Sequence, residues 1–206
     1  MPPELAALVA ASHTAVLTIE VQTDVVGEDS MLPDLAAAAR TIVPDIATLC
    51  RAARAAGVVV VHGTAEFRPD GIGGNTNARL FAATAKRRAS GAPGPPVPAV
   101  LHPALGAEPG DLVIPRRHGV SALHDTGMDS ALRNAGVTTL VVTGVSVNVA
   151  VTGTVIEAVN RGYQVVVPRD AVGGVGADYV EAVLDNTIAL LATMTTTAAL
   201  IAAWAA

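Results

Sequence analysis

The residues best placed to do chemistry are charged side chains at the ends of apolar segments. Glu20 interrupts the apolar residues 14–21, where a carboxylate must be paired or have a shifted pKa. Arg117, which follows the apolar residues 111–114, is predicted to pair with Glu20 or to share a ligand with it, because a guanidinium can hold a carboxylate or stabilise an oxyanion. A surface arginine is the alternative for Arg117, and Arg116 is the better candidate for that role. A buried ion pair with a purely structural role is the alternative for Glu20.

Two kinds of segment, apolar runs and stretches with helical spacing, alternate along most of the chain. Strands are predicted at residues 14–21, 58–62, 111–114, 138–143, 164–167 and 193–196. Helices are predicted at residues 35–56, 77–86, 125–135, 148–161 and 178–191, and after residue 196. Pro44 should kink or split the first long helix. Continuous apolar strands that alternate with helices indicate an α/β domain whose parallel sheet is covered by helices on both faces.

Polar residues directly after the predicted strands are further candidates, because an open parallel sheet binds its ligand at the carboxyl ends of its strands. The predicted substrate contacts are His62 and Arg68 after the second strand, His118 after the third, and Val145, Ser146 and Asn148 after the fourth. The last three lead into a helix, whose first N–H groups form an anion site that could serve as an oxyanion hole. A satisfied structural histidine and a plain strand–helix connection are the alternatives.

The segment of residues 63–110 differs from the rest of the chain, because it is rich in Gly and Pro and has little periodicity. Residues 91–98 within it are predicted to be loop. A long loop inside a compact domain is often a binding element. We therefore expect a single domain over residues 1–206, with the segment 63–110 as a lid or a contact between subunits.

Composition excludes several classes of function. The 206 residues carry a formal net charge of -5 and no basic cluster beyond short pairs, which argues against a nucleic-acid partner but allows a small anionic substrate. Apolar runs of the ~18 residues that a membrane span needs are missing outside the final segment, which threonines interrupt. Residues 1–14 do not have the pattern of a secretory signal. With Cys50 as the single cysteine, no intrachain disulfide can form, so a cytoplasmic location is expected.

Four segments, in order and at matching spacing from about Thr14 to Thr196, together resemble the isochorismatase-like (cysteine hydrolase) family. Ile19-Glu20-Val21-Gln22-Thr23-Asp24 is similar to the pattern Ile-Asp-x-Gln-x-Asp. Gly110-Asp111-Leu112-Val113, through Arg117 to Ser121-Ala122-Leu123, is similar to Gly-Asp-Leu-Val-x-x-Lys-x-x-x-Ser-Ala-Phe. Val142-Thr143-Gly144-Val145-Ser146-Val147-Asn148-Val149-Ala150 is similar to Val-Thr-Gly-Val-x-x-Asn-x-Cys. The segments Gly162-Tyr163-Gln164-Val165-Val166-Val167 and Asp170-Ala171 also fit.

The resemblance implies a three-layer domain with a six-stranded parallel sheet in the order 3-2-1-4-5-6. It also implies a homodimer or homotetramer. The family's catalytic Asp, Lys and Cys correspond to Glu20, Arg117 and Ala150, which would meet at one crevice. Ala150 is thus the position of a missing nucleophile, and the family's thioester route is not available. The family further implies a cis peptide at Val145–Ser146 or at the next bond.

Two hypotheses about function follow. In the first, the protein is a hydrolase that acts on a small polar or anionic molecule by acid–base and electrostatic catalysis, with Glu20 as acid or base and Arg117 as anion binder. His62 or His118 could supply the proton instead. In the second, the protein is a non-catalytic ligand-binding or scaffold member of the same fold. No cofactor is expected. Nor is a catalytic metal, since residues 62–68 contain only one histidine where the metal-using branch of the family has a His/Asp cluster.

Overall fold

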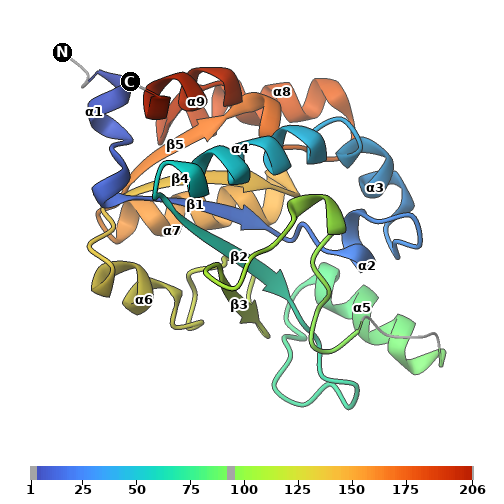
Figure 1. The fold of residues 1–206 in the computed structure, drawn as a ribbon. Coiled ribbons are helices and arrows are strands. Elements are labelled where there is room, and N and C mark those ends of the chain that lie inside the picture. Colours follow the sequence, from blue (N-terminus) through green and yellow to red (C-terminus); the bar gives the residue numbers. More distant parts are fainter. Residues whose placement is uncertain (1–3, 92–95, 206) are drawn as a thin grey trace.

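The chain folds around one parallel sheet, seen in a computed structural model that describes residues 4–91 and 96–205 (Figure 1). Its strands pair in the order β3-β2-β1-β4-β5-β6, which confirms both the predicted fold class and the strand order. The strands are β1 (Thr14–Ile19), β2 (Val59–Ala65), β3 (Leu112–Arg116), β4 (Thr139–Gly144), β5 (Gln164–Pro168) and β6 (Thr193–Thr195).

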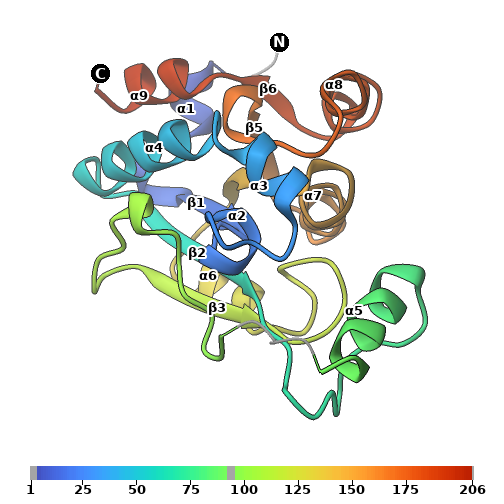
Figure 2. The same ribbon diagram turned by 90° about the vertical axis from the view of Figure 1, so that its right-hand side faces the viewer.

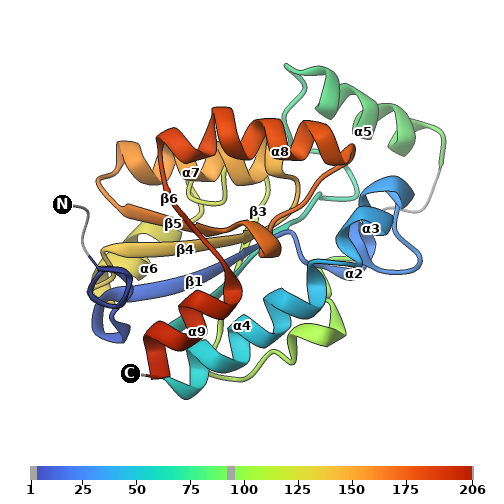
Figure 3. The same cartoon turned by 90° about the horizontal axis from the view of Figure 1, so that it is seen from above.

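Helices cover the two faces of the sheet, as Figure 3 shows. Alternate strand residues point to opposite faces, so β1 contributes Val16 to one apolar cluster and Leu17 to the other. The first cluster contains residues of α1 (Leu5–Leu8), α4 (Val43–Ala55) and α9 (Thr197–Ala205). The second contains residues of α6 (Met128–Asn134), α7 (Thr152–Asn160) and α8 (Ala177–Asn186). Valine is the commonest residue in both clusters, followed by leucine and alanine.

Several predicted helices differ from the observed ones at their ends. The first long helix is split, as Pro44 predicts, into α3 (Pro33–Ala39) and α4. The helix after β4 begins with a π-helical turn, η3 (Val147–Val151), before α7. Short 3-10 turns make up η1 (Ala11–His13), η2 (Pro103–Leu105), η4 (Arg169–Ala171) and η5 (Ile188–Leu190), and α2 (Thr23–Val26) is a single turn after β1.

The segment between β2 and β3 leaves the sheet at its carboxyl edge and carries α5 (Arg79–Ala89), which stands apart from the main body in Figure 2. Phe81 is the buried side chain of this helix, while Leu80 is 54% exposed. Of the predicted loop 91–98, residues 92–95 lie outside the described residues. Within the described parts of the chain, no helix is long and apolar enough to cross a membrane.

Candidate active site

Glu20 lies directly beyond the end of β1, at the carboxyl edge of the sheet. Its φ is 55°, and its N–H donates to the carbonyl of Gly63 at 2.8 Å. A positive φ is uncommon for a residue other than glycine and costs on the order of 1–3 kcal/mol, and such residues cluster at functional sites. The backbone at Glu20 therefore has a costly conformation of the kind that clusters at functional sites.

Arg116, the last residue of β3, is the partner of Glu20. Its guanidinium donates hydrogen bonds to the Glu20 carboxylate and to the carbonyl of Gly119. The two charged side chains are only 9% (Arg116) and 17% (Glu20) exposed. Arg117 is 61% exposed, and its Nε lies 3.6 Å from Oε2 of Glu66. The predicted ion pair between Glu20 and Arg117 is therefore wrong, as is the interpretation of Arg116 as a surface residue.

The register of β3 explains this correction. Its pairing with β2 continues to the last pair, Ala65 with Arg116, so residue 116 still belongs to the strand and residue 117 does not. Successive strand residues point in opposite directions, and an error of one residue exchanges a buried side chain for an exposed one. The sequence pattern is ambiguous at this point, because counting from Asp111 places its Lys at 116 and counting back from Ser121 places it at 117.

The surroundings of Glu20 raise its pKa. Burial is the largest cause, and the nearby carboxylate of Asp24 adds to it, while the charge and hydrogen bond of Arg116 act in the opposite direction. The net effect is a pKa above the ordinary 4.5. Glu20 can therefore hold a proton at a pH where an exposed glutamate has lost it.

Gln22, which is fully buried, fixes the end of β1 against the end of β2. Its Nε2 donates to Oδ1 of Asp24 at 2.8 Å and to the carbonyl of Ala65 at 3.0 Å, and its Oε1 accepts from the Ala65 N–H at 2.8 Å. The amide thus holds the Asp24 carboxylate in place near Glu20.

The turn after β4 lies next to the end of β1, because Gly144 pairs with Ile19. Gly144 has φ 109°, and a Cβ atom there would lie 2.2 Å from the Ile19 carbonyl oxygen, so only glycine fits. The Val145 N–H donates to this same oxygen at 3.0 Å. The peptide between Val145 and Ser146 is cis, which confirms the expectation from the resemblance. Of the three predicted contacts here, Val145 is buried, Ser146 half-buried and Asn148 exposed.

Ala150 is buried in η3 and belongs to the same apolar cluster as Ile19. The Ala150 carbonyl accepts a hydrogen bond from Oγ1 of Thr154 at 2.7 Å. Oγ1 of Thr154 in turn accepts a hydrogen bond from the Ala122 N–H at 3.0 Å. The loop after β3 is therefore tied to the helix that contains Ala150. A methyl group at this position cannot act as a nucleophile.

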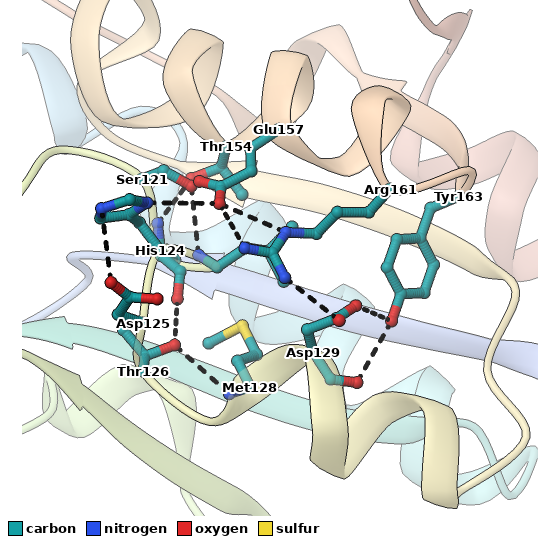
Figure 4. A network of polar contacts seen from close by, with 12 residues as sticks. Ser121, His124, Asp125, Thr126, Met128, Asp129, Thr154, Glu157, Arg161 and Tyr163 are labelled. Atoms are coloured by element: carbon teal, nitrogen blue, oxygen red, sulfur yellow. Dashed lines mark hydrogen bonds and ion pairs between the residues drawn. The ribbon is translucent and has the colours of Figure 1, made fainter.

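A polar network anchors the same loop and α6 to α7, as Figure 4 shows. Arg161 donates to Oε1 of Glu157 at 2.6 Å and to Oδ2 of Asp129 at 3.1 Å, and Tyr163 donates to Oδ1 of Asp129 at 2.8 Å. Nδ1 of His124 lies 3.5 Å from Oε1 of Glu157. These contacts hold the helices together on the second face of the sheet.

His62 is a structural histidine and does not reach the candidate site. It is fully buried within β2, with ring nitrogens 2.8 Å from Oγ1 of Thr18 and 3.2 Å from Oδ2 of Asp111. Burial lowers its pKa, more than the Asp111 carboxylate raises it. The prediction of a substrate contact is wrong because β2 continues three residues further, to Ala65, so His62 is not at the end of the strand.

Arg68, Arg117 and His118 line a hollow of about 230 Å³ between the segments that follow β2 and β3, and neither Glu20 nor Arg116 is among its lining residues. The Arg68 guanidinium is paired with Asp70 at 2.6 Å and is 58% exposed. The His118 ring meets the His124 ring edge to face, with centroids 5.9 Å apart. The other lining residues are Phe67, Gly71, Ile72, Gly73 and Gly74.

Sequence reasoning missed two residues of the site. The signal for Arg116 was the family pattern counted forward from Asp111, which places its Lys at residue 116. Asn75, whose Oδ1 accepts from the Gly119 N–H at 2.6 Å, has no signal in the sequence, because it contacts a turn 44 residues away. Over residues 4–91 and 96–205, no group of three or more His, Cys, Asp or Glu residues is arranged to hold a metal ion.

Comparisons with known proteins identify the family and the fold. The family model for the isochorismatase domain matches residues 14–199. An isochorismatase family protein from Burkholderia thailandensis is 28% identical, with a TM-score of 0.76 over 95% of this chain and 97% of that chain. A cysteine hydrolase from Pseudomonas syringae pv. phaseolicola is 25% identical, with a TM-score of 0.80 over 96% of this chain and 95% of that one.

Curated relatives match over a shorter stretch. A ureidoacrylate amidohydrolase (RutB) from Methylorubrum extorquens is 43% identical over 68 residues, which are 33% of this chain and 27% of that protein. The corresponding protein from Agrobacterium fabrum is 34% identical over 77 residues, which are 37% of this chain and 33% of that protein. The match thus spans a third or less of the length of these relatives.

Proposed function

Because the chain belongs to the isochorismatase family of hydrolases, we propose that it hydrolyses a small polar or anionic molecule without a cysteine nucleophile. The observation that carries this proposal is the direct contact between Glu20 and Arg116, which are 96 residues apart in the chain and meet at the carboxyl edge of the sheet. Both signs of charge are kept at this edge, while Ala150 removes the nucleophile. The remaining chemistry is acid–base and electrostatic.

In this mechanism a water molecule attacks the substrate directly. Glu20 takes a proton from the water as the new bond to oxygen forms, and it returns the proton to the leaving group as the scissile bond breaks. Arg116 stabilises the negative charge that develops on the substrate oxygen, through N–H groups of its guanidinium that Glu20 and Gly119 do not occupy. The raised pKa of Glu20 suits both halves of this cycle.

The substrate class is inferred from the hollow between the segments that follow β2 and β3. Arg68, Arg117 and His118 line it, and such groups favour a carboxylate or another polar oxygen on the part of the substrate that does not react. Ureidoacrylate carries both a carboxylate and a hydrolysable ureido group. The similarity to ureidoacrylate amidohydrolases makes it the first compound to test.

We also propose that the protein works in the cytoplasm as a homodimer or homotetramer. The segment 63–110 would then serve as a lid or as a subunit contact. Its exposed apolar side chains, Ile72 at 70% and Leu80 at 54% exposure, support such a contact.

The test measures hydrolysis of a panel of small ureido acids, carboxylic-acid amides and vinyl-ether acids. Glu20→Gln should reduce turnover by about 10²-fold or more, the usual contribution of a general acid or base. Glu28→Gln is the matched control, because Glu28 is an exposed carboxylate close to Glu20 in the chain. Unchanged turnover in the folded Glu20→Gln variant would show that Glu20 is structural.

A non-catalytic ligand-binding protein is the second candidate, and Ala150 is the observation that favours it. Calorimetry on the same panel separates the two candidates. Binding without turnover, weakened by Arg117→Gln, supports the second.

A further inference from the structure

The turn that follows Arg116 is held by a side chain from the segment between β2 and β3. Oδ1 of Asn75 accepts a hydrogen bond from the N–H of Gly119 at 2.6 Å. The carbonyl of this same Gly119 accepts from Nη1 of Arg116, while Nη2 of Arg116 contacts Glu20. A continuous series of hydrogen bonds therefore leads from Asn75 through Gly119 to Arg116 and Glu20.

Little else holds this turn. Regular strand pairing stops at Arg116, and residues 118–120 form a bend. Among the described residues, the bond from Gly119 to Asn75 is the one hydrogen bond donated by the backbone N–H groups of residues 117–120. Gly119 has φ 68°, and the Arg117 side chain beside it is 61% exposed. The position of Gly119 thus depends on an acceptor from outside the turn.

The loop that supplies Asn75 also lines the hollow that Arg117 and His118 line. Gly71, Ile72, Gly73 and Gly74 are its lining residues from this loop. The loop has internal support, because Oδ1 of Asp70 accepts from the Ile72 N–H at 3.0 Å. A molecule in the hollow would therefore contact both the loop and the turn that Asn75 connects.

We propose that Asn75 is a positioning residue, which holds Gly119 so that the Arg116 guanidinium stays against the Glu20 carboxylate. The catalytic meaning of this contact rests on the proposed function, but the contact itself does not. Asn75 ties the geometry of the acid–base pair to the loop that would touch the substrate.

Loss of the Asn75 oxygen should loosen the turn and weaken the contact between Arg116 and Glu20. Two charged groups act on Glu20 from the neighbouring elements. Arg116 on β3 favours the carboxylate form, and Asp24 on α2 favours the protonated form. When the influence of Arg116 is reduced, burial and Asp24 remain, so Glu20 should bind its proton more tightly.

The experiment compares Asn75→Ala with the wild type, in the protein without substrate, by two NMR measurements. The first follows the ¹³C signal of the Glu20 carboxyl with pH, and the second follows exchange of the Arg116 guanidinium protons with water. Asn75→Ala should move the Glu20 titration to higher pH, in the same direction as Arg116→Gln but by less. It should also speed the exchange at Arg116 by about 3- to 10-fold, the effect of losing one net hydrogen bond.

Two further variants separate positioning from general loosening of the loop. Asn75→Asp keeps an acceptor oxygen for Gly119 and should restore slow exchange at Arg116. Asn77→Ala removes only the acceptor of the hydrogen bond from Nδ2 of Asn75 at 3.2 Å, so both signals should match the wild type.

Wild-type titration and exchange in folded Asn75→Ala would overturn the positioning role. The proposed function would still stand, because it is tested by turnover in Glu20→Gln. Conversely, normal turnover in Glu20→Gln together with fast exchange in Asn75→Ala would remove the proposed function and leave the contact established. Fast exchange in Asn75→Asp as well would also overturn the proposal, since the acceptor would then be irrelevant.

Discussion

Two carboxylates with little exposed surface lie at opposite edges of the parallel sheet. Glu20 follows β1 at the carboxyl edge, and Asp111 precedes β3 at the amino edge. Asp111 accepts hydrogen bonds from Arg54 Nε at 3.0 Å, Arg54 Nη2 at 2.8 Å, the Glu108 N–H at 2.9 Å and the His62 ring at 3.2 Å. Burial raises its pKa, but these bonds outweigh burial, and the net pKa is lowered. Glu20 has one arginine and a neighbouring carboxylate, and its pKa is raised.

The difference separates a carboxylate that stabilises the fold from one that is available for chemistry. Hydrogen bonds connect the Asp111 carboxylate to β2, to α4 and to the chain before β3, so both of its oxygens are satisfied within the fold. Glu20 accepts a side-chain hydrogen bond from Arg116 alone among the described residues. A buried carboxylate whose hydrogen bonds and ion pairs outweigh burial has a lowered pKa and contributes stability, whereas one for which burial prevails has a raised pKa.

The largest effect is expected from Asp111→Asn, which should lower the free energy of unfolding by about 3–5 kcal/mol, because it leaves the half-buried Arg54 charge without a counterion. Urea denaturation at neutral pH measures this. Asp70→Asn is the control, since it removes the carboxylate of an exposed ion pair, and it should have a much smaller effect. A loss for Asp111→Asn no larger than that of the control would contradict the structural role.

The next effect concerns Cys50, which lies on α4 near Arg54 and is fully buried. Burial, the largest cause, raises the pKa of its thiol to about 12. The folded protein should therefore not react with a thiol reagent at neutral pH, and Cys50→Ser should cost about 1–3 kcal/mol through a buried hydroxyl. The Glu20 titration and any turnover should stay unchanged in this variant. Loss of turnover in folded Cys50→Ser would reveal thiol chemistry.

A smaller effect is the pH dependence that His62 contributes. Its pKa is lowered from 6.5 in the folded protein, mainly by burial, so its contribution to stability is present above pH 6.5 and is lost as the pH falls below that value. The loss should not exceed about 1.4 kcal/mol per pH unit. Urea denaturation from pH 8 to pH 5 tests it, with His62→Gln as the variant in which this slope disappears. An equal slope in both proteins would assign the dependence to other groups.

The sequence predicts the sheet well, because runs of valine that are buried on both faces leave few other structures for β1, β2, β4 and β5. The order of the strands came from the resemblance. The site was predicted to the correct edge, and Glu20 was identified because a carboxylate among apolar residues has to be explained. Arg117 was chosen in error because a shift of one residue in the register of β3 exchanges a buried side chain for an exposed one. His62 was predicted at the end of its strand, but β2 extends to Ala65, so the His62 side chain is fully buried. Asn75 required the path of an irregular segment, which periodicity does not encode.

The smallest change in stability is expected from Glu20→Gln, which makes the same carboxylate-to-amide replacement as Asp111→Asn. Because the pKa of Glu20 is raised above 4.5, its contribution to stability is present below pH 4.5 and is lost as the pH rises through the folded-state pKa. Because removal of a carboxylate whose charge burial disfavours offsets the counterion that Arg116 loses, Glu20→Gln should change the free energy of unfolding at neutral pH by no more than about 1 kcal/mol, the size of one net hydrogen bond. Relative to the wild type, it should become more stable between pH 4 and pH 8.

Asp111→Asn should change in the opposite direction, since the lowered pKa of Asp111 gives the wild type stability that is fully present above pH 3.8 and is lost as the pH falls below that value. Urea denaturation of both variants at about pH 2.5, pH 4 and pH 8 therefore compares the two carboxylates: Asp111→Asn should lose stability relative to the wild type between pH 2.5 and pH 4, and Glu20→Gln should gain it between pH 4 and pH 8. If both variants lose stability relative to the wild type as the pH rises, Glu20 is a second structural carboxylate, and its contact with Arg116 no longer supports catalysis. Opposite signs, combined with lost turnover in Glu20→Gln, would mean that this carboxylate is kept for its chemistry at some expense of stability.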